Sequence, residues 1–116
     1  NIIDELLKLI KDRKNFDFVT GCKVNNLVQE LSSKDTDFKS ALEIIYFRFE
    51  EIIAEVLQKA IENNEIQHND AKSLGIYVVA SLEGCLITAK KSHSADMFHD
   101  CISQLELFLN SLKITQ

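Results

Sequence analysis

The sequence contains no proline, and only three of its 116 residues are glycine. Because proline and glycine interrupt helices and build the tight turns of sheet proteins, their scarcity favours long, uninterrupted helices. The fold class is therefore predicted to be all-α. A chain of this length can bury a modest core without a metal or disulfide to hold it, so we expect a single domain over residues 1–116.

Cysteine and basic charge are also scarce. Cys22, Cys85 and Cys101 are too few and too widely spaced for a disulfide scaffold, and no CxxC pair indicates a zinc or redox site. This usage is typical of a reducing, cytoplasmic environment. Thirteen Lys and Arg against eighteen Asp and Glu give a formal charge of −5, which repels phosphate backbones. The segment is not expected to bind DNA by itself.

Long hydrophobic runs are missing as well. The longest mostly apolar stretch, residues 74–89, is interrupted by Ser81 and Glu83 and falls short of the roughly 20 residues that a membrane span needs. We therefore expect no membrane partner. The chain has no signal-peptide pattern and opens inside an amphipathic run, so we expect that it was cut from a longer protein.

Helical periodicity is what the sequence does contain. Apolar residues at three-and-four spacing predict about five helices, over residues 1–12, 20–31, 36–63, 71–89 and 97–112. Asn69 or Asp70 is expected to cap the fourth helix, and residues 92–94 to make the tight turn before the fifth. In the third and longest helix, the predicted core positions are Phe38, Leu42, Ile45, Phe49, Ile52 or Ile53, Val56 and Ala60.

The last two helices are more apolar than a chain of this size can cover by itself. A short turn makes them an antiparallel hairpin, and two such hairpins related by a two-fold axis form an intersubunit four-helix bundle. Small residues allow the copies to approach closely. We therefore predict a homodimer whose interface includes Ala80, Gly84, Ile87, Met97, Cys101, Leu105 and Phe108.

Several local strings resemble the C-terminal regulatory domains of TetR-type transcriptional regulators. The most specific is residues 21–31, GCKVNNLVQEL, in which Gly-Cys is followed by Asn and then by Glu-Leu. Phe49-Glu50 with the run into Asn64-Glu65-Ile66, and the LEGCL string at residues 82–86, are further points of likeness. The resemblance covers most of the chain.

That resemblance implies a function. It implies a dimer built from the last two helices, a small-molecule effector cavity inside each subunit, and no enzymatic activity. Operator DNA would be bound only through an N-terminal helix-turn-helix part, which is absent from this sequence. The ligand would shift the affinity for the operator, and we expect a repressor that the ligand releases.

Asn26 and Gln29 are the first candidate ligand contacts. Their amides lie near the inner side of the expected second helix, where they could bind an effector, cap a neighbouring helix or hold buried water. Cys22, one turn away, is a candidate for the same cavity, although a free cysteine is more often inert packing.

Glu83 is the most informative charge, because burying an unpaired carboxylate costs several kcal/mol. Its expected partner is Lys90, Arg48 or Tyr77, and the alternative is a cationic or hydroxylated effector. Tyr46, Phe49 and Tyr77 are candidates for an aromatic ligand wall together with Phe47, although aromatics at helical spacing are usually core.

No catalytic, metal or cofactor site is predicted. His68, His93 and His99 lack partners at metal-ligand spacing, and the sequence has neither a phosphate loop nor a nucleophile elbow. The rival to an effector-binding regulator is a helical protein-interaction module that holds no ligand. A sensor predicts a cavity with some polar lining, and the interaction module predicts a filled core.

Overall fold

The structure is a computed structural model that describes residues 1–12 and 36–115, with the backbone alone for residues 36–39, 41, 42, 45 and 46. Its helices are α1 (Ile2–Lys11), α3 (Thr36–Glu62), α4 (Ala71–Ser92) and α5 (Ala95–Ser111). Within these ranges the chain forms no strand beyond one isolated bridge between Ile66 and Lys113. The all-α class is therefore confirmed, and the helix expected over residues 20–31 lies outside the described residues.

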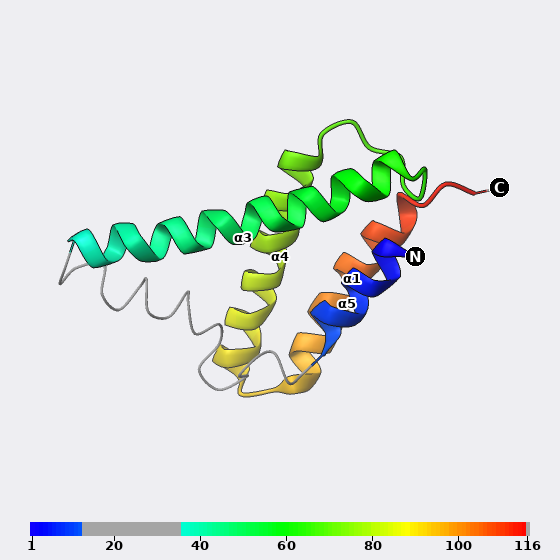
Figure 1. Cartoon of the computed structure of the whole chain (residues 1–116). Coiled ribbons are helices and arrows are strands. Elements are labelled where there is room, and N and C mark those ends of the chain that lie inside the picture. Colours follow the sequence, from blue (N-terminus) through cyan, green and yellow to red (C-terminus); the bar gives the residue numbers. More distant parts are fainter. Residues whose placement is uncertain (13–35, 116) are drawn as a thin grey trace.

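The helices pack as a small orthogonal assembly (Figure 1). α3 crosses α4, α5 returns antiparallel beside α4, and α1 lies against α3 and α5. α4 is thus the central helix, with a long helix on one flank and its own hairpin partner on the other.

The start of α4 follows the predicted capping chemistry, and α5 begins at Ala95, two residues earlier than expected. Asp70 caps α4: its Oδ1 accepts the backbone N–H of Ser73 at 3.0 Å and its Oδ2 accepts the Ser73 hydroxyl at 2.8 Å. His93 ends the same helix in the left-handed conformation, with φ at 49°. Ser94 then caps α5 by accepting the N–H of Met97 at 3.3 Å. The expected tight turn is confirmed.

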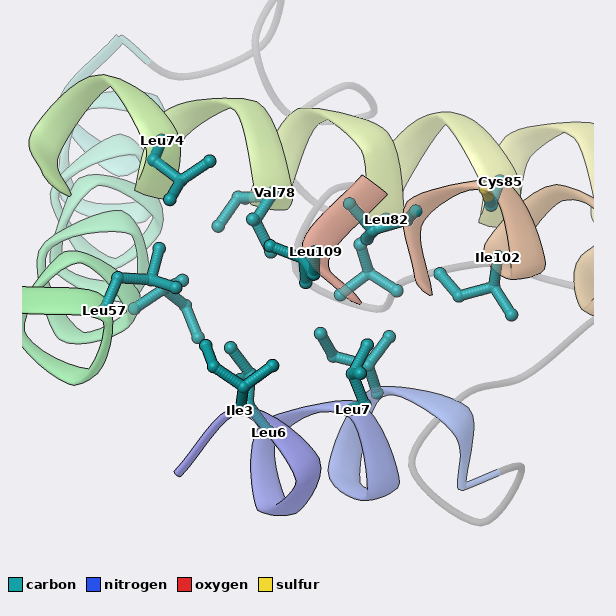
Figure 2. Packing of buried hydrophobic residues seen from close by; sticks show 14 of the residues in the cluster. Ile3, Leu6, Leu7, Leu57, Leu74, Val78, Leu82, Cys85, Ile102 and Leu109 are labelled. Carbon is teal, nitrogen blue, oxygen red and sulfur yellow. The ribbon is translucent and has the colours of Figure 1, made fainter. Parts of the chain in front are cut away.

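The core gathers apolar residues from each of the described helices (Figure 2). Ile3 and Leu7 of α1 point toward Leu57 of α3 and Leu109 of α5 across the interior. α3 differs from the predicted pattern. Among its described side chains, Ile53, Leu57 and Ala60 are buried, whereas Phe49 and Ile52 are exposed. The side chains of Phe38, Leu42 and Ile45 lie outside the described residues. Of the two alternatives Ile52 and Ile53, it is Ile53 that lies in the core. The prediction of Val56 as a core residue is corrected, because Leu57 is the fully buried residue of that turn.

α3 and α4 touch at Gly75. A methyl group built on Gly75 would lie 3.0 Å from both the Cβ and the backbone nitrogen of Ala54. Only glycine permits this approach, because a larger side chain would have to displace the backbone of α3. Gly75 therefore sets the distance at which the two helices cross.

The loop after α3 holds both ends of the described chain. The Glu65 carboxylate accepts the backbone N–H of Ile2 at 2.7 Å, at the start of α1. The Glu65 carbonyl accepts the N–H of Ile114 at 3.1 Å, and Gln67 donates its N–H to the carbonyl of Leu112 at 2.8 Å. One loop thus fastens α1 and the segment after α5 to the end of α3.

α4 is longer than the apolar stretch that the sequence analysis compared with the length of a membrane span. With 22 residues it is long and apolar enough to cross a membrane by length and composition alone, and half of its most apolar stretch is buried inside the fold. The prediction considered only residues 74–89, whereas the helix begins at Ala71 and ends at Ser92. Burial against α3 and α5 gives these apolar residues a place in the core of a helical bundle.

Two of the three cysteines are bonded to each other. Cys85 of α4 and Cys101 of α5 form a disulfide, with their Cα atoms 5.4 Å apart. The sequence spacing gave no reason to expect this bond. The pair meets because the hairpin reverses midway between the two positions, and Cys101 therefore faces α4.

Candidate functional site

The candidate site is a partly open apolar pocket bordered by α1, α3 and α4, called the inner pocket below. Its volume is about 270 Å³. Its described lining is entirely apolar and consists of Leu6, Leu9, Ile10, Phe49, Ile53, Val78, Val79 and Leu82. A space of this kind suits a small apolar molecule, because burial of apolar surface is its main source of affinity.

The crossing at Gly75 explains where this space arises. Phe49 and Ile53 precede Ala54 on α3, and Val78 and Val79 follow Gly75 on α4. Since the two backbones touch at Gly75 and diverge from there, a wedge opens between them. α1 borders the third side of the wedge with Leu6 and Ile10, which are both buried.

Glu83 provides a buried charge close to this pocket. Glu83 is only 7% exposed to solvent. It stands four residues after Val79, so it lies one helical turn beyond the pocket wall on the same side of α4. Arg48, one of its expected partners, instead donates to Glu51 at 3.0 Å and Glu55 at 3.4 Å on the exposed side of α3. That pairing, first through Glu51, raises the pKa of Arg48.

The aromatic candidates separate onto different sides of the molecule. Phe49 lines the inner pocket, as predicted for a ligand contact. Tyr77 lies on the far side of α4, is 53% exposed, and packs against Phe108 rather than near Glu83 or Phe49. Tyr77 does not line the inner pocket, since helical spacing alone does not say which way a side chain points, and its role as a ligand contact stays a prediction. Tyr46 belongs to α3, but its side chain, like all of Cys22, Asn26 and Gln29, lies outside the described residues.

The interface candidates also divide into two groups. An exposed apolar strip on α4 and α5, called the outer face below, contains Ile76, Tyr77, Ala80, Gly84, Ile87, Met97 and Phe108. Leu105 is only 4% exposed and belongs to the subunit's own core. Cys101 is half-buried and bonded to Cys85. These two residues therefore do not lie on the outer face, where the broad apolar stripe of α5 had placed them.

Gly84 lies in open space on the outer face. A Cβ built there meets no atom within 4 Å. Gly75 differs in this respect, because contacts with Ala54 leave little room for a side chain there. At Gly84, no contact within the described chain calls for a glycine. The outer face thus has a flat central section between Tyr77 and Ile87.

A second groove runs between α1 and α5 and is polar. Its walls carry opposite charges that pair across it: Lys11 with Glu106 at 2.8 Å and Lys113 with Asp4 at 2.5 Å. The hydrogen bond from Lys113 lowers the pKa of Asp4. Because these exposed charges already satisfy each other, the groove is weaker than the inner pocket as a ligand site.

The described residues contain no group of three His, Cys, Asp or Glu side chains arranged to hold a metal ion. His68 accepts the backbone N–H of Asp70 through Nδ1 at 3.0 Å, and His93 ends α4. These two histidines thus have structural positions at the two ends of that helix.

Comparison with known proteins identifies the family of this chain. Residues 2–104 match the sequence family described as "Transcriptional regulator LmrA/YxaF-like, C-terminal domain". The matched region includes α1, α3, α4 and more than half of α5. No curated protein and no solved structure matches the chain.

Proposed function

Because this chain belongs to the LmrA/YxaF-like C-terminal domains of TetR-type transcriptional regulators, we propose that it binds a small apolar effector in the inner pocket and dimerises through the outer face. The family is one of regulators and not of enzymes. The observation that carries the proposal is the pairing of an apolar pocket on one side of α4 with an apolar exposed strip on the other.

A single helix then connects the two activities. Val78, Val79 and Leu82 line the pocket, while Tyr77, Ala80 and Gly84 belong to the outer face, so both groups share the middle of α4. An effector that favours one position of α4 changes the relation of the two subunits by its differential binding. The whole regulator is, in this proposal, a cytoplasmic repressor. The relative position of its two subunits sets the spacing of the DNA-binding parts and therefore the affinity for the operator.

Dimerisation is tested at Gly84. The wild-type chain should sediment as a dimer, and Gly84→Leu as a monomer, because the larger side chain wedges the two copies apart. The single chain has room for this side chain at its Cβ, so loss of the dimer would report on the interface and not on misfolding. Gly84→Ala, with one methyl group, is the milder control. A Gly84→Leu dimer of unchanged mass would refute the assignment of the outer face.

Effector binding is tested at Phe49. Native mass spectrometry of the purified chain should reveal a bound small molecule, and Phe49→Ala should lose it by removing a wall of the inner pocket. Phe47→Ala is the matched control, since Phe47 lies two residues away on α3 and lines a different groove. If no molecule is bound and apolar compounds leave the melting temperature of the wild type unchanged, the chain is an interaction module instead.

A further inference from the structure

We propose that Cys85 and Cys101 form a reversible dithiol–disulfide site through which an oxidant adjusts the outer face. The redox chemistry of this site stands by itself. Its effect on dimerisation rests on the proposed function, and the experiments below separate the two.

The disulfide joins the two helices that carry the outer face. The Cα atoms of Cys85 and Cys101 are 5.4 Å apart, which is within the usual range for a disulfide. Gly84 precedes Cys85 directly, and Met97 lies one turn before Cys101, so the bond lies beside the middle of the strip. Opening or closing this disulfide therefore changes the structure at the place where a second copy is proposed to pack.

The hairpin does not depend on the disulfide to form. The turn at His93 and Ser94 already connects the helices, and Phe98, Ile102 and Leu109 of α5 are buried in the shared core. A cross-link over a short loop also removes less entropy from the unfolded chain than one over a long loop. The bond can thus open and close while the hairpin stays folded, as a switch requires.

The two sulfurs differ in accessibility, which sets the order of the chemistry. Cys85 is 3% exposed, whereas Cys101 is half-buried at the edge of the core. An external reagent therefore reaches Cys101 first, and Cys85 acts as the internal, resolving thiol.

The oxidant class that fits this arrangement is a small disulfide of the glutathione type. The Cys101 thiolate attacks one sulfur of the oxidant, forms a mixed disulfide and releases one small thiol after the leaving sulfur takes up a proton. The Cys85 thiolate then attacks the Cys101 sulfur, the mixed bond breaks, and a second small thiol leaves. Two protein thiols are oxidised and one small disulfide is reduced to two thiols, so atoms and electrons balance.

Closing the bond alters the helix spacing at this level. Two bonded sulfurs stand closer than two thiols in van der Waals contact, so reduction pushes α4 and α5 apart beside Gly84 or turns the two side chains. The disulfide form, with the outer face described above, is the form proposed to dimerise. We expect reduction to weaken the dimer about ten-fold, a common size for coupling between two sites.

The first experiment counts thiols in the native wild-type chain equilibrated with mixtures of reduced and oxidised glutathione. After alkylation, intact mass should show three labels on the reduced chain and one on the oxidised chain, since the sequence has three cysteines. Trypsin cleaves after Lys90 and Lys91, so the Cys85 and Cys101 peptides remain joined only through the disulfide. Cys101→Ser is the control that cannot form this link.

Two results would overturn the redox site. One is a disulfide that excess reduced glutathione fails to open in the folded chain, because it would be a fixed structural bond. The other is a chain that keeps three free thiols in excess oxidised glutathione, or that links Cys22 in place of either partner.

The second experiment measures the dimer dissociation constant by sedimentation in both redox states. The wild type should change about ten-fold, and the Cys85→Ser, Cys101→Ser double variant should not respond to glutathione. Equal dissociation constants for the reduced and the oxidised chain would overturn the redox control of dimerisation but not dimerisation itself. A monomer in both states, with the thiol counts as expected, would refute the proposed dimer and its redox control and leave only the reversible bond.

Discussion

The ring of Tyr77 on α4 meets the ring of Phe108 on α5 edge to face, with centroids 5.4 Å apart and planes inclined at 72°. This contact lies at the end of the hairpin opposite the turn at His93 and Ser94. The hairpin is therefore joined on its outside by an aromatic pair at one end and by the chain itself at the other.

A double-mutant cycle on Tyr77→Ala and Phe108→Ala should give a coupling of about 0.5–1.5 kcal/mol, because edge-to-face rings attract beyond their buried area. Urea unfolding in a Gly84→Leu background, where a monomer is expected, measures it without interference from association. Ile87→Ala paired with Phe108→Ala is the control, since Ile87 lies two turns or more from the rings. Equal coupling in both cycles would contradict the assignment.

Gly75→Ala and Gly84→Ala should have opposite effects on the stability of one subunit. At Gly75 the methyl group meets the backbone of Ala54, so we expect a loss of about 1–3 kcal/mol. At Gly84 the methyl group meets nothing within 4 Å, and better helix propensity should add up to about 1 kcal/mol. Thermal and urea unfolding of both variants check this, and a stabilised Gly75→Ala would argue against the close crossing.

Glu65→Ala should loosen the start of α1. The variant removes the carboxylate that accepts the Ile2 N–H and should cost about 1.5 kcal/mol, as expected for a hydrogen bond to a charged group. Hydrogen exchange should show faster loss of protection in α1 than in α5. Glu65→Gln keeps a side-chain acceptor and should retain most of the protection, so equal damage by the two variants would count against this role.

Asp70 should make the stability of α4 depend on acid. The Ser73 backbone N–H, followed by the Ser73 hydroxyl, lowers the pKa of the Asp70 carboxyl. A lowered folded-state pKa gives stabilisation that is complete above the ordinary carboxyl pKa and is lost as the pH falls below about 4. Asp70→Asn also caps helices well but does not titrate. Melting curves between pH 3 and 6 should therefore show a smaller acid loss for Asp70→Asn than for wild type.

Helix ends and the outer face were largely predictable from the sequence. Asp70 was one of two predicted caps of α4, and the turn at residues 92–94 was predicted as well, because capping and turn chemistry is local. Ala80, Gly84 and Ile87 were predicted to be uncovered because α4 is apolar nearly all round, and the structure leaves all three exposed. Their contact with a second copy stays a prediction.

Packing between helices was less predictable. Ile52 and Ile53 are equally apolar, and only the approach of Ala54 to Gly75 decides which of them turns inward. The inner pocket depends on the same crossing, so of its lining residues only Phe49 was named beforehand as a ligand contact. The meeting of Cys85 with Cys101 needs the hairpin register, which depends on where the turn falls.

The contact of Gly75 with Ala54 has a mechanical consequence. Two helices that meet at one point, with only the small side chain of Ala54 between their backbones, can rotate about that point more easily than they can move closer together. α3 can then turn as a lever about Ala54: its short arm ends at Glu62, three residues before the Glu65 that accepts the Ile2 N–H at the start of α1, and its long arm passes the inner pocket. Under the proposed function, we expect a molecule that fills the wedge to push on the part of α3 before Ala54 and to shift the first residues of α1 through Glu65.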